Sequence, residues 1–367
     1  MKKRIWAAVL TLAMSLSVLT ACGGGKQEEP SVTESNAEAT ADDSEAESDK
    51  EEKEAPSGED MSLTVYASVL EDYMIEALKK FSEETGVDAQ GVRLGVGETL
   101  GRLRAEKENP QASVWFGGAA ETYLAAQNDG LLEPYISPNA ADIPDKYKDP
   151  EGHWTGFYVG YLGFASNKRL LEEKGLDVPT SWEDLLAPEL KGQVSIANPA
   201  ASGTSYNMLA TLAMSMGEQE AIDYMVKLDE NVKQYEKSGT APARLVGQGE
   251  AIVGVTYMHD SLKYWEEGLS DIVVSAPDSG TGYEIGSIAV IKGGPDQEAA
   301  KMFVDWILKN AELGQQYGSY QFLTDPKLKQ PEIAQPYFDT KLVDFDLEYA
   351  ADNRDRLVQE WADAVGQ

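Results

Sequence analysis

The stretch GVTYMHDSLKYW, from Gly254 to Trp265, places His259 directly before Asp260 and among aromatic residues. These side chains could act as a catalytic base, a metal ligand, a sugar contact or a satisfied surface pair. Adjacent residues are badly placed to form a general base and its orienting group. The other histidine of the chain, His153, shares no ligand spacing with His259, which disfavours a histidine metal site. The pair taken alone leaves its role open, because a lone histidine is more often structural than functional.

Hydroxyl residues and glycines stand before expected helices. Ser202-Gly203-Thr204 directly precedes the apolar-periodic run SYNMLATLAM. A helix start offers free N–H groups and the positive end of the helix dipole, so this motif could bind an anion. Serine and threonine are also preferred N-cap residues, and for this motif alone a cap is the simpler interpretation.

The same arrangement recurs along the chain. In open α/β sheets ligands bind beyond the carboxyl ends of the strands, where helix starts converge. Several converging helix starts favour a binding site more strongly than one does. Two arginines near the second expected strand, Arg93 and Arg102, could contribute charge. The binding positions expected on these grounds are Ser68, Gly117, Gly118, Ser202, Gly203, Thr204, Ser238 and Thr240.

Short apolar runs alternate with amphipathic segments from Ser62 onwards, which is typical of an α/β protein with a mostly parallel sheet. Two long extended runs, Gly156 to Lys168 and Asp271 to Gly294, bracket a second α/β block. We expect both runs to cross between two lobes and to form a hinge. The expected division is lobe 1 over 61–163 and 278–310, lobe 2 over 164–277, and helices over 311–367 that pack on the outside of the lobes.

The first residues, MKKRIWAAVLTLAMSLSVLTAC, combine a basic head, an apolar run and small residues before Cys22, which is the layout of a secretory signal. Leu19 to Cys22 also resembles the bacterial lipoprotein processing box. We therefore expect a signal peptide over 1–21 and a lipid on Cys22. The acidic, apolar-poor segment 22–60 is expected to be a disordered tether, because it cannot bury enough surface to offset its ordering entropy. The chain would then be anchored on the outer face of the cell membrane.

Composition excludes several classes of protein. Cys22 is the only cysteine, so no internal disulfide and no cysteine-based metal or redox site can form. The net charge of −32 disfavours nucleic acid as a partner, because that partner needs a basic face. We expect a monomer without a cofactor, stabilised by packing.

No sequence motif supports an enzyme. Ser202 follows Ala200-Ala201 and so lacks the Gly-x-Ser-x-Gly pattern of a nucleophile. Gly95, Gly97 and Gly101 match a nucleotide-binding fingerprint poorly, because the third glycine is one position late. An exported phosphate-ester hydrolase is kept as an alternative from another class.

Residues from Ser62 to about Tyr320 resemble the solute-binding lipoproteins of ABC importers, in the branch that binds ferric ion, hexose phosphates or aminoethylphosphonate. The resemblance rests on RLRAEKENPQASVWFGG, VPTSWEDLLAPELKGQVSIANPAASGTSY, VGVTYMHDSLKY and GTGYEIGSIAVIKG, in that order. It implies a two-lobed α/β fold of the periplasmic-binding-protein type II, with mixed sheets joined by a two-strand hinge. It also implies delivery of a solute to a permease without chemistry on that solute.

The resemblance also suggests a cargo. Ferric binders of the branch carry adjacent tyrosines where this chain has Tyr257 followed by Met258. The tyrosine pair is therefore missing, which disfavours free ferric ion and leaves ferric ion or a ferric-anion complex as the alternative cargo. Hexose-phosphate binders hold sugar hydroxyls with a His-Asp pair and a glutamate, which His259, Asp260 and Glu284 match. Ser202 to Thr204 match the phosphate side, and Tyr257 is expected among the ligand contacts. Leu94 to Gly97 depart from the Ser-Ser-Gly turn of many relatives. We expect a small anionic solute, either a phosphorylated sugar or an organophosphonate.

Overall fold

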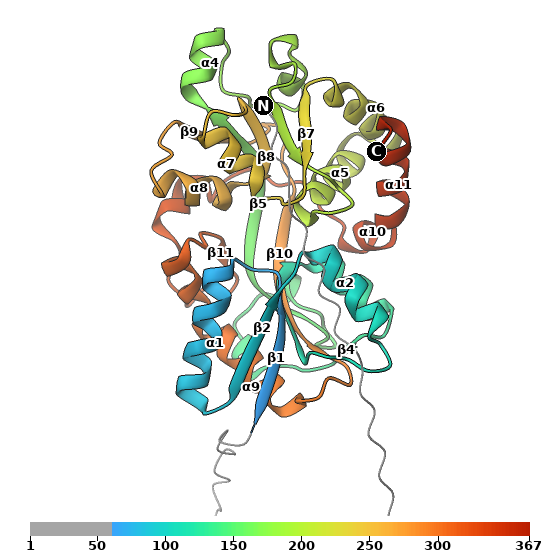
Figure 1. Ribbon diagram of the computed structural model, residues 1–367, viewed down its shortest axis with the longest axis vertical. Coiled ribbons are helices and arrows are strands. Elements are labelled where there is room, and N and C mark those ends of the chain that lie inside the picture. The colour runs from blue at the N-terminus through green and yellow to red at the C-terminus, as the bar shows by residue number, and fades with distance from the viewer. Residues whose placement is uncertain (1–60) are drawn as a thin grey trace, which may run out of the picture. The chain divides into compact units, whose positions relative to one another are not determined.

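A mixed β-sheet runs through the protein. The computed structural model describes residues 61–367, and the expected signal peptide, Cys22 and tether lie outside the described residues. The strands are β1 Ser62–Ala67, β2 Asp88–Arg93, β3 Val114–Ala119, β4 Leu132–Glu133, β5 Thr155–Asn167, β6 Val194–Ala197, β7 Val232–Glu236, β8 Val253–Tyr257, β9 Ile272–Ser275, β10 Tyr283–Ile291 and β11 Phe322–Leu323. Their main path is β2-β1-β3-β10-β5-β8-β6-β7 (Figure 1). β1 pairs in parallel with β2 and β3, and β6 with β7 and β8, whereas β5 and β10 are antiparallel to their neighbours.

Helices follow most of the strands. They are α1 Glu71–Thr85, α2 Val96–Ala105, α3 Ala120–Asn128, α4 Lys168–Lys174, α5 Gly203–Met216, α6 Glu218–Asp229, α7 Ala241–Gly247, α8 Met258–Glu266, α9 Gln297–Asn310, α10 Leu347–Asp352 and α11 Arg354–Val365. None of the helices within 61–367 has the length and apolar character needed to cross a membrane.

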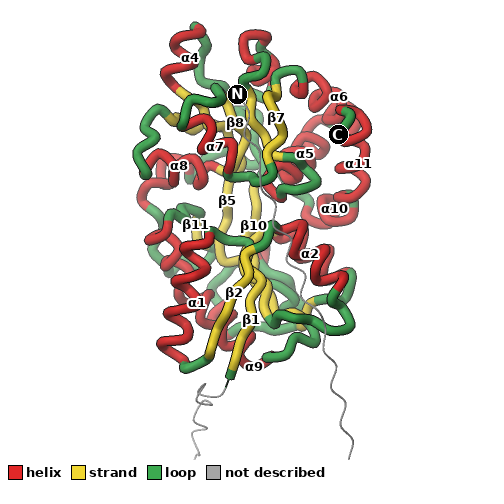
Figure 2. The backbone as a smooth tube through the Cα atoms, in the orientation of Figure 1, coloured by secondary structure: helices red, strands yellow, loops and turns green. Residues whose placement is uncertain are grey.

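Strand β5 joins the two lobes of the fold. Its residue Tyr161 pairs with Tyr283 of β10, and the next residue, Leu162, pairs with Tyr257 of β8. One strand therefore passes from lobe 1, built around β1 to β4 and β10, into lobe 2, built around β6 to β9. Figure 2 shows β5 and β10 side by side at the centre. β5 is buried along nearly its whole length, which explains its continuous apolar sequence. The residue boundaries expected for the lobes remain a prediction.

The second expected crossing differs from the sequence-based expectation. Residues 271–294 do not form one extended run, because β9 ends at Ser275 and β10 begins at Tyr283. Pro277 supplies no N–H for a strand ladder, and its carbonyl accepts a hydrogen bond of 2.9 Å from the Gly280 N–H. Gly280 has a φ of 115°. The turn 276–282 therefore links β9 in lobe 2 to β10 in lobe 1.

Helices cover both faces of the lobe 1 sheet. α1 and α9 bury Phe81 against Phe303, with ring centroids 5.1 Å apart. On the opposite face Tyr123 of α3 stacks on Trp115 of β3 at 4.0 Å. At the C-terminus α10 packs on α3, whereas α11 packs on α5 and α6 and buries Trp361 in the core of lobe 2. Packing of helices on both faces fixes the sheet, and the carboxyl ends of its parallel strands face the junction of the lobes.

Candidate ligand-binding site

A cavity of about 520 Å³ lies where the two lobes meet. It is reached from the carboxyl ends of β1, β3 and β8, as expected for an α/β sheet. Gly117 does not line it; the Gly117 carbonyl accepts a hydrogen bond of 2.8 Å from the Tyr123 hydroxyl. The other positions expected from the sequence all line it: Ser68, Gly118, Ser202, Gly203, Thr204, Ser238, Thr240, Tyr257, His259, Asp260 and Glu284.

Hydroxyl groups gather on the lobe 2 side of the cavity, and we name Ser202, Thr204, Ser238 and Thr240 the hydroxyl cluster. The Ser202 hydroxyl accepts from the Ser205 N–H at 3.4 Å and so caps α5. Gly239 allows the 238–240 loop to contact the start of α5, because a Cβ there would lie 2.1 Å from Thr204 Oγ1 and 2.8 Å from Ser202 Oγ. The cap and the anion site considered from the sequence are therefore compatible, because the capped helix start also faces the cavity.

The cavity floor is formed by His259, Asp260 and Glu284. α8 begins directly after β8, so His259 and Asp260 occupy its first turn, while Glu284 comes from β10. All three side chains are buried. His259 Nε2 lies 3.8 Å from Asp260 Oδ1 and 4.0 Å from Glu284 Oε1, too far for hydrogen bonds. His259 Nδ1 also has no hydrogen-bond partner within residues 61–367. His259, Asp260 and Glu284 therefore do not satisfy one another's hydrogen-bonding capacity.

Burial controls the protonation of the floor. Loss of water lowers the pKa of His259 to about 3, so the imidazole is neutral at physiological pH. Burial raises the pKa of Asp260 to about 7, opposed in part by the Thr256 hydroxyl, which can donate to the ionised carboxylate. The pKa of Glu284 is raised well above its ordinary value by burial and then by the charges of Asp260 and Glu121. Neutral groups of this kind both donate and accept hydrogen bonds.

Positive charge lies at the exposed side of the cavity. Arg93, at the end of β2, lines it and donates through Nε to the Val69 carbonyl at 3.1 Å. Arg102 does not line it, because its guanidinium pairs with Glu106 at 2.8 Å. Lys237 also lines it and was not expected from the sequence, although its position directly before Ser238 was a usable signal. Tyr158 and Gln321 also line it, without any sequence signal. Glu98, in the first turn of α2, adds one carboxylate to the lining.

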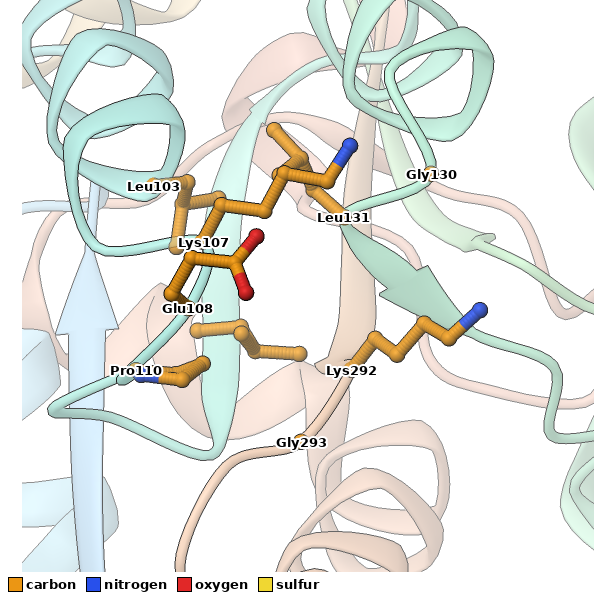
Figure 3. A pocket seen from close by; sticks show the side chains of 9 residues that line it. Leu103, Lys107, Glu108, Pro110, Gly130, Leu131, Lys292 and Gly293 are labelled. Atoms are coloured by element: carbon orange, nitrogen blue, oxygen red, sulfur yellow. The ribbon is translucent and has the colours of Figure 1, made fainter.

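A second hollow of about 360 Å³ lies in lobe 1, beside the end of β10. Lys107, Glu108 and Lys292 surround it with their charged ends apart from one another (Figure 3). All three residues are exposed. The hollow adjoins the C-terminal end of α2, which carries the negative end of a helix dipole. It therefore lacks the converging donors of the larger cavity. Within 61–367 no cluster of three or more histidine, cysteine, aspartate or glutamate side chains is arranged to hold a metal ion.

Comparison with known proteins assigns the family. Residues 120–345 match the family of bacterial extracellular solute-binding proteins. The structure of the periplasmic binding protein AfuA from Actinobacillus pleuropneumoniae, with exogenous fructose-6-phosphate bound, is 37% identical, with a TM-score of 0.80 over 84% of this chain and 99% of that one. The periplasmic binding protein P5PA is 32% identical, with a TM-score of 0.78 over 83% of this chain and 100% of its own. A Salmonella typhimurium periplasmic protein, whose name provisionally assigns it to 2-aminoethylphosphonate, is 28% identical over 69% of this chain and 76% of its own.

The chain is a two-lobed α/β protein of the periplasmic-binding type, with a mixed sheet. It belongs to the family of bacterial extracellular solute-binding proteins. The resemblance inferred from the sequence is therefore confirmed for the family and for the fold. Membership implies a location on the outer side of the cell membrane, a small-molecule solute and a permease partner.

Substituting Gly160 by alanine tests the packing of the floor. A Cβ at Gly160 of β5 would lie 2.6 Å from His259 Cε1 and 2.9 Å from Glu284 Oε1. We expect Gly160→Ala to displace both side chains and to weaken binding of any solute the floor contacts by about tenfold or more, equivalent to about 1.4 kcal/mol. Calorimetric titration measures the affinity. Gly101→Ala is the matched control, since no atom lies within 4 Å of its added Cβ. Unchanged affinity in Gly160→Ala with an intact fold would contradict this account of the floor.

The protonation of Asp260 predicts a pH-dependent stability of the ligand-free protein. Its pKa is raised from 3.8 to about 7 on folding, so the folded state holds the proton more tightly than the unfolded chain. The resulting stabilisation is complete below pH about 4 and is lost as pH rises through about 7, by roughly 2 kcal/mol or more. Asp260→Asn should remove this part of the decline, as measured by denaturant unfolding at pH 5 and pH 8. An identical decline in both proteins would mean that Asp260 does not titrate in this way.

Proposed function

We propose that this solute-binding protein captures a phosphorylated sugar or an organophosphonate between its lobes and passes it unchanged to the permease of an ABC importer. The observation that carries the proposal is the division of the cavity. Hydroxyls, a helix start and two cations face one part of it, and a neutral, hydrogen-bonding floor forms the other.

The anionic group of the cargo fits the hydroxyl cluster at the start of α5. Free N–H groups and the helix dipole there favour an oxyanion. Arg93 and Lys237 add positive charge from opposite lobes. The phosphate or phosphonate is therefore held by charge-assisted hydrogen bonds, which are stronger than neutral ones.

The remainder of the cargo fits the floor. Sugar hydroxyls both donate and accept, and so do a neutral imidazole and protonated carboxyl groups. The fructose-6-phosphate bound in the similar AfuA structure supports a cargo of this size and polarity. A bare metal cation would meet too few ionised oxygens at this floor.

No step of chemistry on the solute is proposed, which sets aside the hydrolase alternative. We propose that Cys22 carries a lipid that anchors the protein to the membrane, and that the protein acts as a monomer.

Native mass spectrometry of the protein purified without added ligand tests the cargo directly. We expect a sugar phosphate or a phosphonate to be released on denaturation and identified by its mass. Release of iron would overturn the proposal in favour of a ferric cargo. An empty protein that shows no thermal shift with any sugar phosphate or phosphonate would also overturn it.

Substitutions separate the two parts of the site. His259→Ala and Asp260→Ala should each weaken fructose 6-phosphate binding by about 1.5 to 3 kcal/mol, because each removes a partner of a buried hydrogen bond. Lys237→Gln should weaken both fructose 6-phosphate and inorganic phosphate. Arg102→Gln serves as the control, since Arg102 lies outside the cavity. Calorimetric titration and a circular dichroism spectrum distinguish loss of binding from loss of fold. Wild-type affinity in both floor variants would mean that the His-Asp pair is structural.

A further inference from the structure

The Thr256 hydroxyl touches both parts of the cavity wall. Thr256 lies in β8 and is fully buried. Its Oγ1 is 2.8 Å from the Gly239 carbonyl, in the loop of the hydroxyl cluster, and 3.2 Å from Asp260 Oδ2, in the floor. It does not itself line the cavity. One buried hydroxyl therefore connects the anion side to the floor.

The number of protons limits how this hydroxyl can bond. A threonine hydroxyl has one proton, and a carbonyl oxygen can only accept. While Thr256 donates to Gly239, its contact with Asp260 is a hydrogen bond only if the carboxyl group of Asp260 carries the proton and donates it. Once Asp260 is ionised, Thr256 is drawn to donate to the carboxylate instead. The Gly239 carbonyl then loses its only hydrogen-bond donor within residues 61–367.

Loss of that bond acts on the hydroxyl cluster. Gly239 packs directly against Thr204 and Ser202, so any movement of the 238–240 loop changes the spacing of the hydroxyls. Gly239 is half-buried beside the cavity. Its carbonyl, once it has lost the Thr256 donor, needs another partner, which favours movement of the loop.

Charges of both signs act on Asp260, so a solute bound in the cavity can change whether its carboxyl group is protonated. Arg93 and Lys263 favour the ionised carboxylate. Glu284 opposes it. The other titratable groups near it are neutral at physiological pH, and they are His259, Tyr158, Tyr257 and Tyr264. A solute that presents hydroxyls to the floor leaves Asp260 protonated, whereas one that presents an ammonium group favours ionisation.

We propose that Thr256 is a positioning residue that ties the protonation of Asp260 to the placement of the hydroxyl cluster, so that the site selects anionic solutes bearing hydroxyl groups over those bearing an ammonium group. This selectivity rests on the proposed function, whereas the link between Asp260 and the loop does not. A phosphorylated sugar keeps the Thr256 to Gly239 bond and meets an ordered hydroxyl cluster. An aminophosphonate ionises Asp260 and weakens the site that must hold its phosphonate.

The link is tested without any cargo by following backbone amide signals of the ligand-free protein by NMR as pH varies. The Thr240 amide shares its peptide group with the Gly239 carbonyl. We expect its signal in the wild type to shift with a midpoint near pH 7, where Asp260 titrates. The shift should persist in Thr256→Ser and vanish in Thr256→Val and in Asp260→Asn. A threonine with only a packing role would leave the titration in place in Thr256→Val, and that result would overturn the proposal.

The selectivity is tested by calorimetric titration with fructose 6-phosphate and 2-aminoethylphosphonate as probes. Wild type should bind fructose 6-phosphate at least tenfold more tightly, and Thr256→Val should reduce this ratio severalfold while Thr256→Ser retains it. For fructose 6-phosphate, the dissociation constant of Thr256→Val divided by that of wild type should decrease as the pH rises from 5.5 to 8.5. The reason is that the wild type itself loses the Thr256 to Gly239 bond at high pH. Tighter binding of the aminophosphonate by wild type would overturn the selectivity. An amide titration without binding of either probe would leave the link standing and overturn the cargo assignment alone.

Discussion

The burial of an imidazole and two carboxyl groups side by side is the constraint on which this site depends. Transfer of an ionised carboxylate out of water costs several kcal/mol unless a cation compensates it. His259 cannot serve as that cation, because its own burial keeps it neutral. Asp260 and Glu284 are therefore driven toward their protonated forms. The floor becomes a set of neutral donors and acceptors in a protein that otherwise carries a large negative charge, and that charge is screened within about 8 Å at physiological salt.

The strands at the junction of the lobes place these groups. Glu284 on β10 pairs with Gly160 on β5, and Tyr257 at the end of β8 pairs with Leu162 on the same β5 strand. The absence of a side chain at Gly160 leaves the space that His259 and Glu284 occupy. The floor thus lies where β8 and β10 both pair with the crossing strand β5, whereas Ser68 and Arg93 come from lobe 1 and the hydroxyl cluster from lobe 2. Rotation of one lobe against the other would alter the spacing of the anion contacts more than that of the floor.

Features that depend on local sequence could be predicted. Strands followed by glycine and hydroxyl residues located the cavity wall, and the apolar run at 156–168 identified the crossing strand β5. Features that depend on which strands lie side by side could not. The role of Gly160 follows from its register against Glu284, and the role of Thr256 follows from the contact of β8 with the 238–240 loop. The expected long extended run over 271–294 is interrupted because Pro277 and Gly280 favour a turn, a local signal that the apolar pattern on either side concealed. Gly117 was grouped with Gly118 as a site residue, yet its carbonyl bonds the Tyr123 hydroxyl of α3, a contact that the sequence does not reveal.

Charge and hydrogen bonding are separated in depth within the cavity. Arg93 and Lys237 are exposed at its edge, where solvent weakens their interaction with a bound anion but leaves them able to attract one. The floor has little long-range field, because its groups are neutral, but its donors and acceptors have fixed positions and are shielded from water. A neutral site with unmet hydrogen bonds discriminates strongly against solutes that lack matching polar groups, since each unmatched buried group costs about 1 to 3 kcal/mol. Under the proposed function, attraction of anions in general and selection among them fall to different residues. The exposed cations would then tolerate changes in number or position, whereas a change at His259, Asp260 or Glu284 would alter which solute is accepted.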